Sequence, residues 1–209
     1  MPRALAPLLI AALLLGGCIP RRGDAPFRLG PATPSLRQCL IRLDEARVRY
    51  TRLPDRDYGR GCLVRDAVQL RAVGPQVTSL GATTCATAAA FVDWLQSDLT
   101  VPAVGEFGSP VARIETFGTF ACRNVNNAAH GRLSEHAFAN AVDVSGFVLA
   151  NGRRITVLQG WHGDPREQRF LRSVRAGACR RFRTVLSPDY NSLHANHLHL
   201  DMGGARLCR

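Results

Sequence analysis

The sequence contains no lysine, so all 27 of its basic side chains are arginines. Against 16 acidic residues they leave a formal net charge of +11, which favours anionic surroundings such as nucleic acid, anionic lipid or a cell-wall polymer. Internal repeats and low-complexity tracts are also missing. With 209 residues, 46% of them hydrophobic and 21% charged, the chain predicts one globular domain or a small two-lobed one, and a large multidomain enzyme is excluded.

No apolar run is long enough to cross a bilayer comfortably, because about 20 residues are needed. The run from Ala6 to Leu15 follows one arginine near the start and precedes small residues, which is a secretory signal pattern. Leu15-Gly16-Gly17-Cys18 resembles the bacterial lipobox, in which the cysteine is lipidated and begins the mature chain. The alternative is an ordinary cleaved signal peptide with a cysteine near the cut.

The lipobox divides the chain into a signal peptide (1–17), a lipid anchor at Cys18 with a flexible tether (18–34), and a folded domain (35–209). We therefore expect an exported lipoprotein that faces the periplasm. Ile19 is not acidic, which favours the outer membrane through the same resemblance.

The sequence has no Cys-x-x-Cys pair, which argues against a cysteine zinc site. Apart from Cys18, six cysteines remain, an even set that predicts three disulfides in an oxidising compartment. Six cysteines allow 15 connectivities. We expect pairing between neighbours, with other pairings left open: Cys39 with Cys62, Cys85 with Cys122, and Cys179 with Cys208.

The apolar spacing predicts helices and strands in roughly equal measure. Helices are expected over 34–50 after the cap Thr33, over 85–99 before Pro102, and from Pro165 to Gly177 after the cap Asp164. Strands are expected between 62 and 84, over 141–149 and 153–158 around the turn Asn151-Gly152, and over 198–202. This order favours an α+β fold around a mainly antiparallel sheet.

No histidine precedes position 130, so all six lie in the second half of the chain. His136 precedes Asp143, which enters the predicted hairpin strand, by seven residues. His197, His199 and Asp201 alternate along the last strand, so their side chains share one face. The two clusters are the candidate site.

Two imidazoles and one carboxylate, with a fourth position left for water, are the ligands of a catalytic zinc site. An unpaired aspartate such as Asp143 would be costly to bury in an apolar strand, and a divalent cation removes that cost. The alternative for a lone His-x-His is a surface pair or a hydrogen-bonded core pair. Cobalt or nickel would accept the same donors.

The segments SEHAFANAVDVSGF and HANHLHLD resemble the extensin-like C-terminal domain family of bacteria, which is similar to the zinc D,D-peptidases. Those peptidases share the pattern S-x-H-x-x-G-x-A-x-D followed by H-x-H. The glycine position is held here by Ala139. The matching residues are Ser134, His136, Ala141, Asp143, His197 and His199. The family resemblance covers Cys39 to the C-terminus, and it implies the zinc fold shared by D,D-peptidases and hedgehog proteins.

The resemblance implies one zinc ion held by His136, Asp143 and His199. Many D,D-peptidases have a glutamate base where this chain has Asn196, which cannot take a proton. Murein endopeptidases instead use H-x-x-H-x-H.

That second arrangement is reproduced by His194, His197 and His199. The resemblance makes His197 the acid/base and His194 a contact to the substrate or to another residue of the site. Arg123 matches an upstream arginine that holds a terminal carboxylate or stabilises developing negative charge.

We expect a zinc-dependent peptidase that cuts an amide bond in peptidoglycan stem peptides or cross-links. The alternative is a non-catalytic cell-wall-binding domain that retains the peptidase fold, and Asn196 is its main support. Nucleic acid is not an expected partner, because the chain is exported and lacks an interleaved aromatic-basic stripe.

Overall fold

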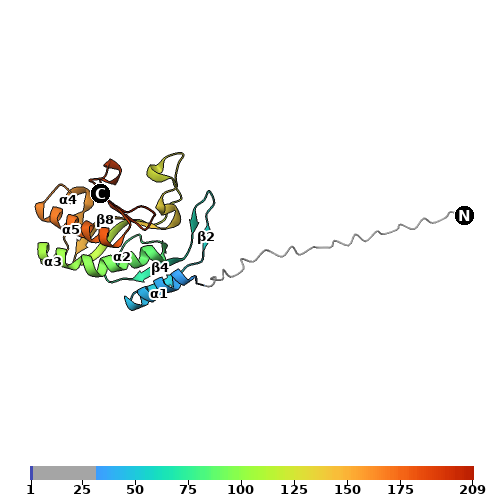
Figure 1. Ribbon diagram of the computed structural model, residues 1–209, viewed down its shortest axis with the longest axis horizontal. Coiled ribbons are helices and arrows are strands. Elements are labelled where there is room, and N and C mark those ends of the chain that lie inside the picture. The colour runs from blue at the N-terminus through green and yellow to red at the C-terminus, as the bar shows by residue number, and fades with distance from the viewer. Residues whose placement is uncertain (2–31) are drawn as a thin grey trace.

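A computed structural model describes Met1 and residues 32–209. The predicted signal peptide after Met1, the lipidation site Cys18 and almost all of the tether lie outside these residues. Residues 32–209 form one body in which helices gather on one side (Figure 1). Within this part of the chain, no helix combines the length and the apolar character needed to cross a membrane.

Five helices are interspersed with twelve strands along residues 32–209. The helices are α1 (Pro34–Glu45), α2 (Cys85–Asp98), α3 (Thr100–Phe107), α4 (Val157–Gly160) and α5 (Pro165–Arg181), with 3₁₀ turns η1 (Val125–Asn127), η2 (Glu135–Phe138) and η3 (Ser192–His194). The strands are β1 (Arg49–Arg52), β2 (Arg56–Asp57), β3 (Leu63–Val64), β4 (Ala67–Ala72), β5 (Gln76–Val77), β6 (Thr83–Thr84), β7 (Val111–Gly118), β8 (Ala141–Leu149), β9 (Arg154–Thr156), β10 (Thr184–Leu186), β11 (Leu198–Asp201) and β12 (Leu207–Cys208).

The largest sheet has the strand order β12-β10-β11-β8-β7-β5, and β9 pairs with β8. Its central pairs β10–β11, β11–β8, β8–β7 and β8–β9 are antiparallel, while β10–β12 and β5–β7 at its edges are parallel. A smaller sheet joins β1, β4 and β6, and β2 pairs with β3. The predicted α+β fold with a mainly antiparallel sheet is therefore confirmed.

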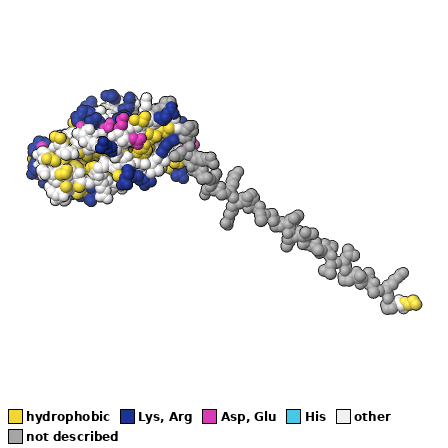
Figure 2. Space-filling view, turned by 90° about the horizontal axis from the view of Figure 1, so that it is seen from below, with side chains coloured by type: hydrophobic (Ala, Val, Ile, Leu, Met, Phe, Trp, Pro, Cys, Tyr) yellow, Lys and Arg dark blue, Asp and Glu magenta, His cyan; other side chains and the backbone are white. Residues whose placement is uncertain are grey.

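Alternation along the central strands gives the large sheet one apolar face and one polar face. Val142 and Val144 on β8, and Leu198 and Leu200 on β11, belong to the core that includes residues of α2 and α5. Side chains one residue away, such as Asp143, point to the opposite face. From the side of α1 and α2, none of the coloured side chains is a histidine (Figure 2). The polar face is therefore the one that can carry the site.

The first helix is shorter than predicted. Thr33 caps α1 by accepting a hydrogen bond from the backbone N–H of Leu36, as expected, but the helix ends at Glu45 instead of Tyr50. Arg47 adopts a positive φ of 56°, which stops the helix, and the chain continues as β1. Apolar spacing alone did not reveal this end, because no glycine or asparagine occupies the left-handed position.

The predicted helix over 85–99 is confirmed as α2, which ends at Asp98, but the helix α3 that follows it was not predicted. Pro102 lies in the first turn of α3, where a missing N–H costs nothing. The predicted end of the helix that begins at Pro165 was wrong. Gly177 lies inside α5, which continues to Arg181. A Cβ at Gly177 would lie 2.5 Å from the Cβ of Asp98 on α2, so this glycine serves the close approach of two helices.

The hairpin around Asn151-Gly152 is confirmed, with Gly152 at a φ of +87°. Its second strand is shorter than expected, because α4 begins at Val157. Strand β7 was not anticipated, although it pairs with both β8 and β5. It brings Gly118 opposite Asp143, at the edge of the candidate site.

Six cysteines form three disulfides, as predicted. Cys179–Cys208 is the expected pair. The other two expected pairings are wrong, because the bonds are Cys39–Cys85 and Cys62–Cys122. The first bond joins α1 to the start of α2, and the second joins the β2–β3 hairpin to the segment that follows β7. The folded chain, and not loop length, decides which sulfurs meet.

Candidate metal centre

His136, Asp143 and His199 converge at one point on the polar face of the sheet. One ligand atom from each lies within 4.8 Å of the others, and all three residues are buried. His136 Nε2 is 3.1 Å from Asp143 Oδ2 and 3.2 Å from His199 Nδ1, and His199 Nδ1 is 2.9 Å from Asp143 Oδ1. The sequence placed these side chains together although the second and third are 56 residues apart.

Strand register and a left-handed turn build this cluster. His199 on β11 pairs directly with Asp143 on β8, so both side chains leave the same face of the sheet. His136 arrives from η2, which ends at Ala139 with a φ of 53°. The position where the D,D-peptidase pattern has glycine is thus a left-handed one, and an alanine there is strained by about 1 kcal/mol.

The backbone fixes which nitrogen of His136 faces the cluster. His136 Nδ1 lies 3.2 Å from the carbonyl oxygen of Thr119, which can only accept a hydrogen bond. Nδ1 therefore carries a proton, and Nε2 is the nitrogen that faces Asp143 and His199. A hydrogen bond that leaves the other nitrogen free is the usual support of a metal-binding histidine.

In His199 the two ring nitrogens have the opposite roles from those in His136. Its Nε2 donates to Asp201 Oδ2 at 2.9 Å, and Asp201 Oδ1 accepts from the backbone N–H of Gly203 at 2.7 Å. Nδ1 is the nitrogen that faces the cluster. Burial lowers the pKa of His199, but hydrogen bonds and the charges of Asp143 and Asp201 outweigh burial and raise it to about 9.

The carboxylate of Asp143 is ionised in this setting. Burial acts to raise its pKa, but hydrogen bonds from His136 and His199 and their charges hold the pKa well below its usual range. A buried anion between two imidazoles is compensated by positive charge, whether that charge is a proton or a metal cation.

His194, at the end of η3, and His197, the residue before β11, flank the cluster. His197 Nε2 lies 3.6 Å from Asp143 Oδ1, and its ring packs edge-on against Phe117 at 5.8 Å between centroids. Burial, followed by the nearby histidine charges, lowers the pKa of His194 to about 4, and burial also lowers the pKa of His197. Both imidazoles are therefore neutral near pH 7 and can accept protons.

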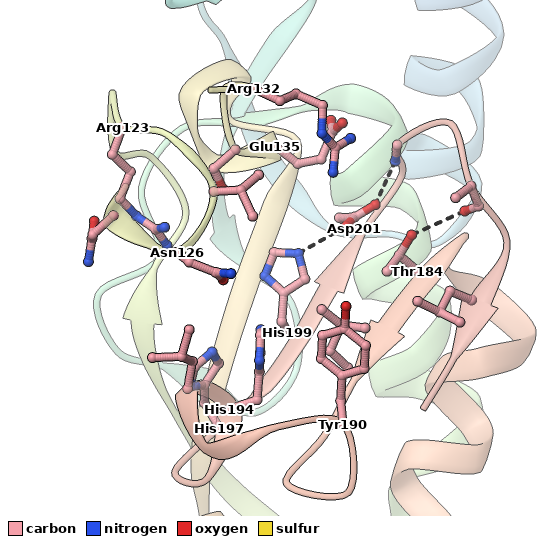
Figure 3. A pocket seen from close by; sticks show the side chains of 18 of the residues that line it. Arg123, Asn126, Arg132, Glu135, Thr184, Tyr190, His194, His197, His199 and Asp201 are labelled. Carbon is pink, nitrogen blue, oxygen red and sulfur yellow. Dashed lines mark hydrogen bonds and ion pairs between the residues drawn. The ribbon is translucent and has the colours of Figure 1, made fainter. Parts of the chain in front are cut away.

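A cleft of about 340 Å³ opens above the cluster (Figure 3). His199 and Asp201 form its floor, His194 and His197 form one wall, and the segment from Arg123 to Glu135 forms the wall opposite. His136 and Asp143 lie below this floor, among the buried residues.

Arg123 contributes to the cleft as its motif position suggested. Its Nη1 donates to the carbonyl oxygen of Asn124 at 3.5 Å, and among residues 32–209 no carboxylate forms an ion pair with it. Its guanidinium is thus available to an anionic group in the cleft. Asn126, Arg132 and Tyr190 also line the cleft, and the sequence assigned no role to the last two.

The donor set fits a divalent metal ion. Two imidazole nitrogens and a carboxylate oxygen face one another, and Thr119 and Asp201 hold the two rings from behind. Nitrogen and oxygen donors in this number suit zinc.

Comparison with known proteins adds one finding. No curated protein and no solved structure shows significant similarity to the chain. The family described as "Extensin-like protein C-terminus" matches residues 37–209, which include every helix and strand from β1 onward and the whole candidate metal centre. The chain therefore belongs to the extensin-like C-terminal family.

Proposed function

We propose that this chain is a zinc-dependent peptidase that hydrolyses an amide bond in peptidoglycan stem peptides or cross-links. One observation carries the proposal: His136, Asp143 and His199 present their ligand atoms to one point, and His199 also forms part of the floor of a cleft. Zinc bound there would supply a Lewis acid that activates water and polarises a carbonyl group.

The chain's own residues provide the remaining chemistry. His197 Nε2 lies beside the cluster and takes a proton from the attacking water, then returns it to the leaving amine. Arg123, on the opposite wall, holds a substrate carboxylate or stabilises the negative charge that develops on the carbonyl oxygen.

The resemblance to zinc D,D-peptidases supports the same proposal. The matched residues His136, Asp143 and His199 are those that this resemblance makes zinc ligands, and the geometry of the three side chains is consistent with that role. The mainly antiparallel sheet with helices on one face is compatible with a D,D-peptidase fold.

The proposed location agrees with this substrate. A lipidated Cys18 would anchor the mature chain to a membrane facing the periplasm, most simply the outer membrane, with the domain directed at the cell wall. A net charge of +11 suits a polymer that carries carboxylates.

A non-catalytic cell-wall-binding domain is the second candidate. It is favoured by Asn196, which holds the position of the glutamate base in many D,D-peptidases. The two candidates share the cleft and the metal ligands, and they differ only in whether a product forms.

The experiment is a digestion of purified muropeptides by the full-length protein supplied with zinc. We expect new products by mass spectrometry, loss of these products with a chelator, and their return when zinc is added back. Binding to intact sacculi without any product, under the same zinc-replete conditions, would favour the binding domain.

A further inference from the structure

Each of the two histidines in the cleft wall is held by an asparagine close to it in the sequence. His194 Nδ1 lies 2.7 Å from Asn191 Oδ1, and His197 Nδ1 lies 2.8 Å from Asn196 Oδ1. No side-chain hydrogen bond joins either asparagine to His136, Asp143 or His199, so each acts on the centre through its histidine.

The direction of the first hydrogen bond is fixed by a second one. Asn191 Oδ1 also accepts the backbone N–H of Leu193 at 3.1 Å, so the oxygen of this amide faces η3. An oxygen acceptor requires that His194 Nδ1 be the donor. His194 Nε2 is consequently unprotonated in the neutral ring and faces the cleft that the residue lines.

His197 has a similar contact, without a second hydrogen bond to the amide oxygen. Asn196 Oδ1 lies 2.8 Å from Nδ1 and accepts from it, which leaves Nε2 free on the side of Asp143, 3.6 Å from Oδ1. The ring is confined between Phe117, at 5.8 Å, and His194, at 5.1 Å between centroids. Packing sets the ring plane, and the amide decides which nitrogen carries the proton.

We propose that Asn191 and Asn196 are positioning residues, which hold His194 and His197 as Nδ1–H tautomers so that both Nε2 lone pairs face the cleft. This inference rests on the proposed function and deepens it. It assigns a role to Asn196. The residue cannot take a proton itself, but it holds the His197 ring in the tautomer that can accept one at Nε2.

The test is the protonation pattern of the histidine rings in the ¹⁵N-labelled full-length protein, read by long-range ¹H–¹⁵N correlation near neutral pH. Metal-free protein is used, so the result does not depend on activity. We expect His194 and His197 with the proton on Nδ1. A proton found on Nε2 of His197 in the unmodified chain would overturn the assignment to Asn196, and likewise for His194 and Asn191.

Matched variants separate positioning from folding. Asn196→Leu removes the acceptor at similar size and should move proton population of His197 to Nε2, while Asn196→Asp keeps an acceptor oxygen and should retain Nδ1–H. Asn191→Leu and Asn191→Asp form the same pair for His194. The exposed His162 should give unchanged signals in all variants. An unchanged His197 pattern in Asn196→Leu would refute the role.

Kinetics on muropeptides give the second measurement. Asn196→Leu should lower kcat by about tenfold with KM nearly unchanged, since a misoriented base slows proton transfer without removing substrate contacts. Asn196→Asp should restore most of the rate. If the unmodified protein shows the expected tautomers but cleaves no muropeptide, the peptidase proposal fails while the positioning of both rings stands.

Discussion

Asp143 and His199 are direct partners across the β8–β11 pair, with Oδ1 and Nδ1 2.9 Å apart. The two side chains meet because the strand register places His199 opposite Asp143. A slip of one residue would turn one of the two side chains into the core between the sheet and the helices. Val142 and Val144 flank Asp143 in the sequence and point into the core on the opposite face. Their burial specifies the register, and the register places Asp143 beside His199.

Removing one proposed ligand should abolish tight metal binding. In His136→Ala, two of the three donors remain, and we expect zinc content to fall from about one ion per chain to a small fraction after dialysis, because catalytic sites use three protein ligands. Elemental analysis by mass spectrometry measures this ratio.

The matched control for that measurement is His162→Ala, which removes an exposed histidine in the turn before α5. Its zinc content should equal that of the unmodified chain. Equal zinc content in His136→Ala and His162→Ala would show that the cluster is not the metal centre.

Asp201 supports the centre from behind His199, and its loss should weaken metal binding without abolishing it. Asp201→Asn keeps an oxygen acceptor for His199 Nε2 but removes the negative charge, so we expect zinc affinity to fall by about tenfold. Competition with a fluorescent chelator gives the dissociation constant.

Asp189→Asn is the control for charge removal, because Asp189 accepts from Trp161 Nε1 and Arg172 instead of from a histidine of the site. This variant should bind zinc as the unmodified chain does. Identical affinities for Asp201→Asn and the unmodified chain would contradict a supporting role for Asp201.

The sequence predicted what depends on local periodicity. Alternation along 141–149 and 198–202 correctly placed Asp143, His199 and Asp201 on strands, and the caps Thr33 and Asp164 correctly began two helices. The period of two also put His199 and Asp201 on one face, where they form a hydrogen bond.

Features that depend on distant parts of the chain were missed. The role of Gly177 is visible only once Asp98 lies against it, and the pairing of Cys62 with Cys122 requires the β2–β3 hairpin to reach the segment after β7. Likewise, the hydrogen-bond acceptor that fixes the His136 ring is the backbone carbonyl oxygen of Thr119, which no side-chain pattern in the sequence reveals.

The disulfide Cys62–Cys122 should matter for the cleft as well as for stability. Cys122 precedes Arg123, so opening this bond in Cys62→Ser/Cys122→Ser releases the wall that carries the guanidinium. We expect KM for muropeptides to rise several-fold, with a smaller change in kcat.

Cys39→Ser/Cys85→Ser is the comparison, because that bond closes a span of 46 residues against 60 for Cys62–Cys122. Chain-entropy arguments give each bond about 4 kcal/mol, so both variants should lose similar unfolding free energy. KM should rise only in the first. An equal rise in KM in both variants would mean that a general loss of stability, and not the position of the cleft wall at Arg123, weakens substrate binding.

Gly177 allows a direct test of the contact between α2 and α5. A Cβ there would lie 2.5 Å from Asp98 Cβ and 2.9 Å from Asp98 Cγ, so Gly177→Ala must push the helices apart or displace a buried carboxylate that pairs with Arg181 at 2.9 Å. We expect a loss of about 1–3 kcal/mol in unfolding free energy, despite the better helix propensity of alanine.

Gly105→Ala in α3 is the control, because a Cβ at this position meets nothing within 4 Å. This variant should be neutral or stabilising by up to about 1 kcal/mol. Urea denaturation of both variants separates the two effects, and a stabilised Gly177→Ala would show that the helices do not approach as closely as described.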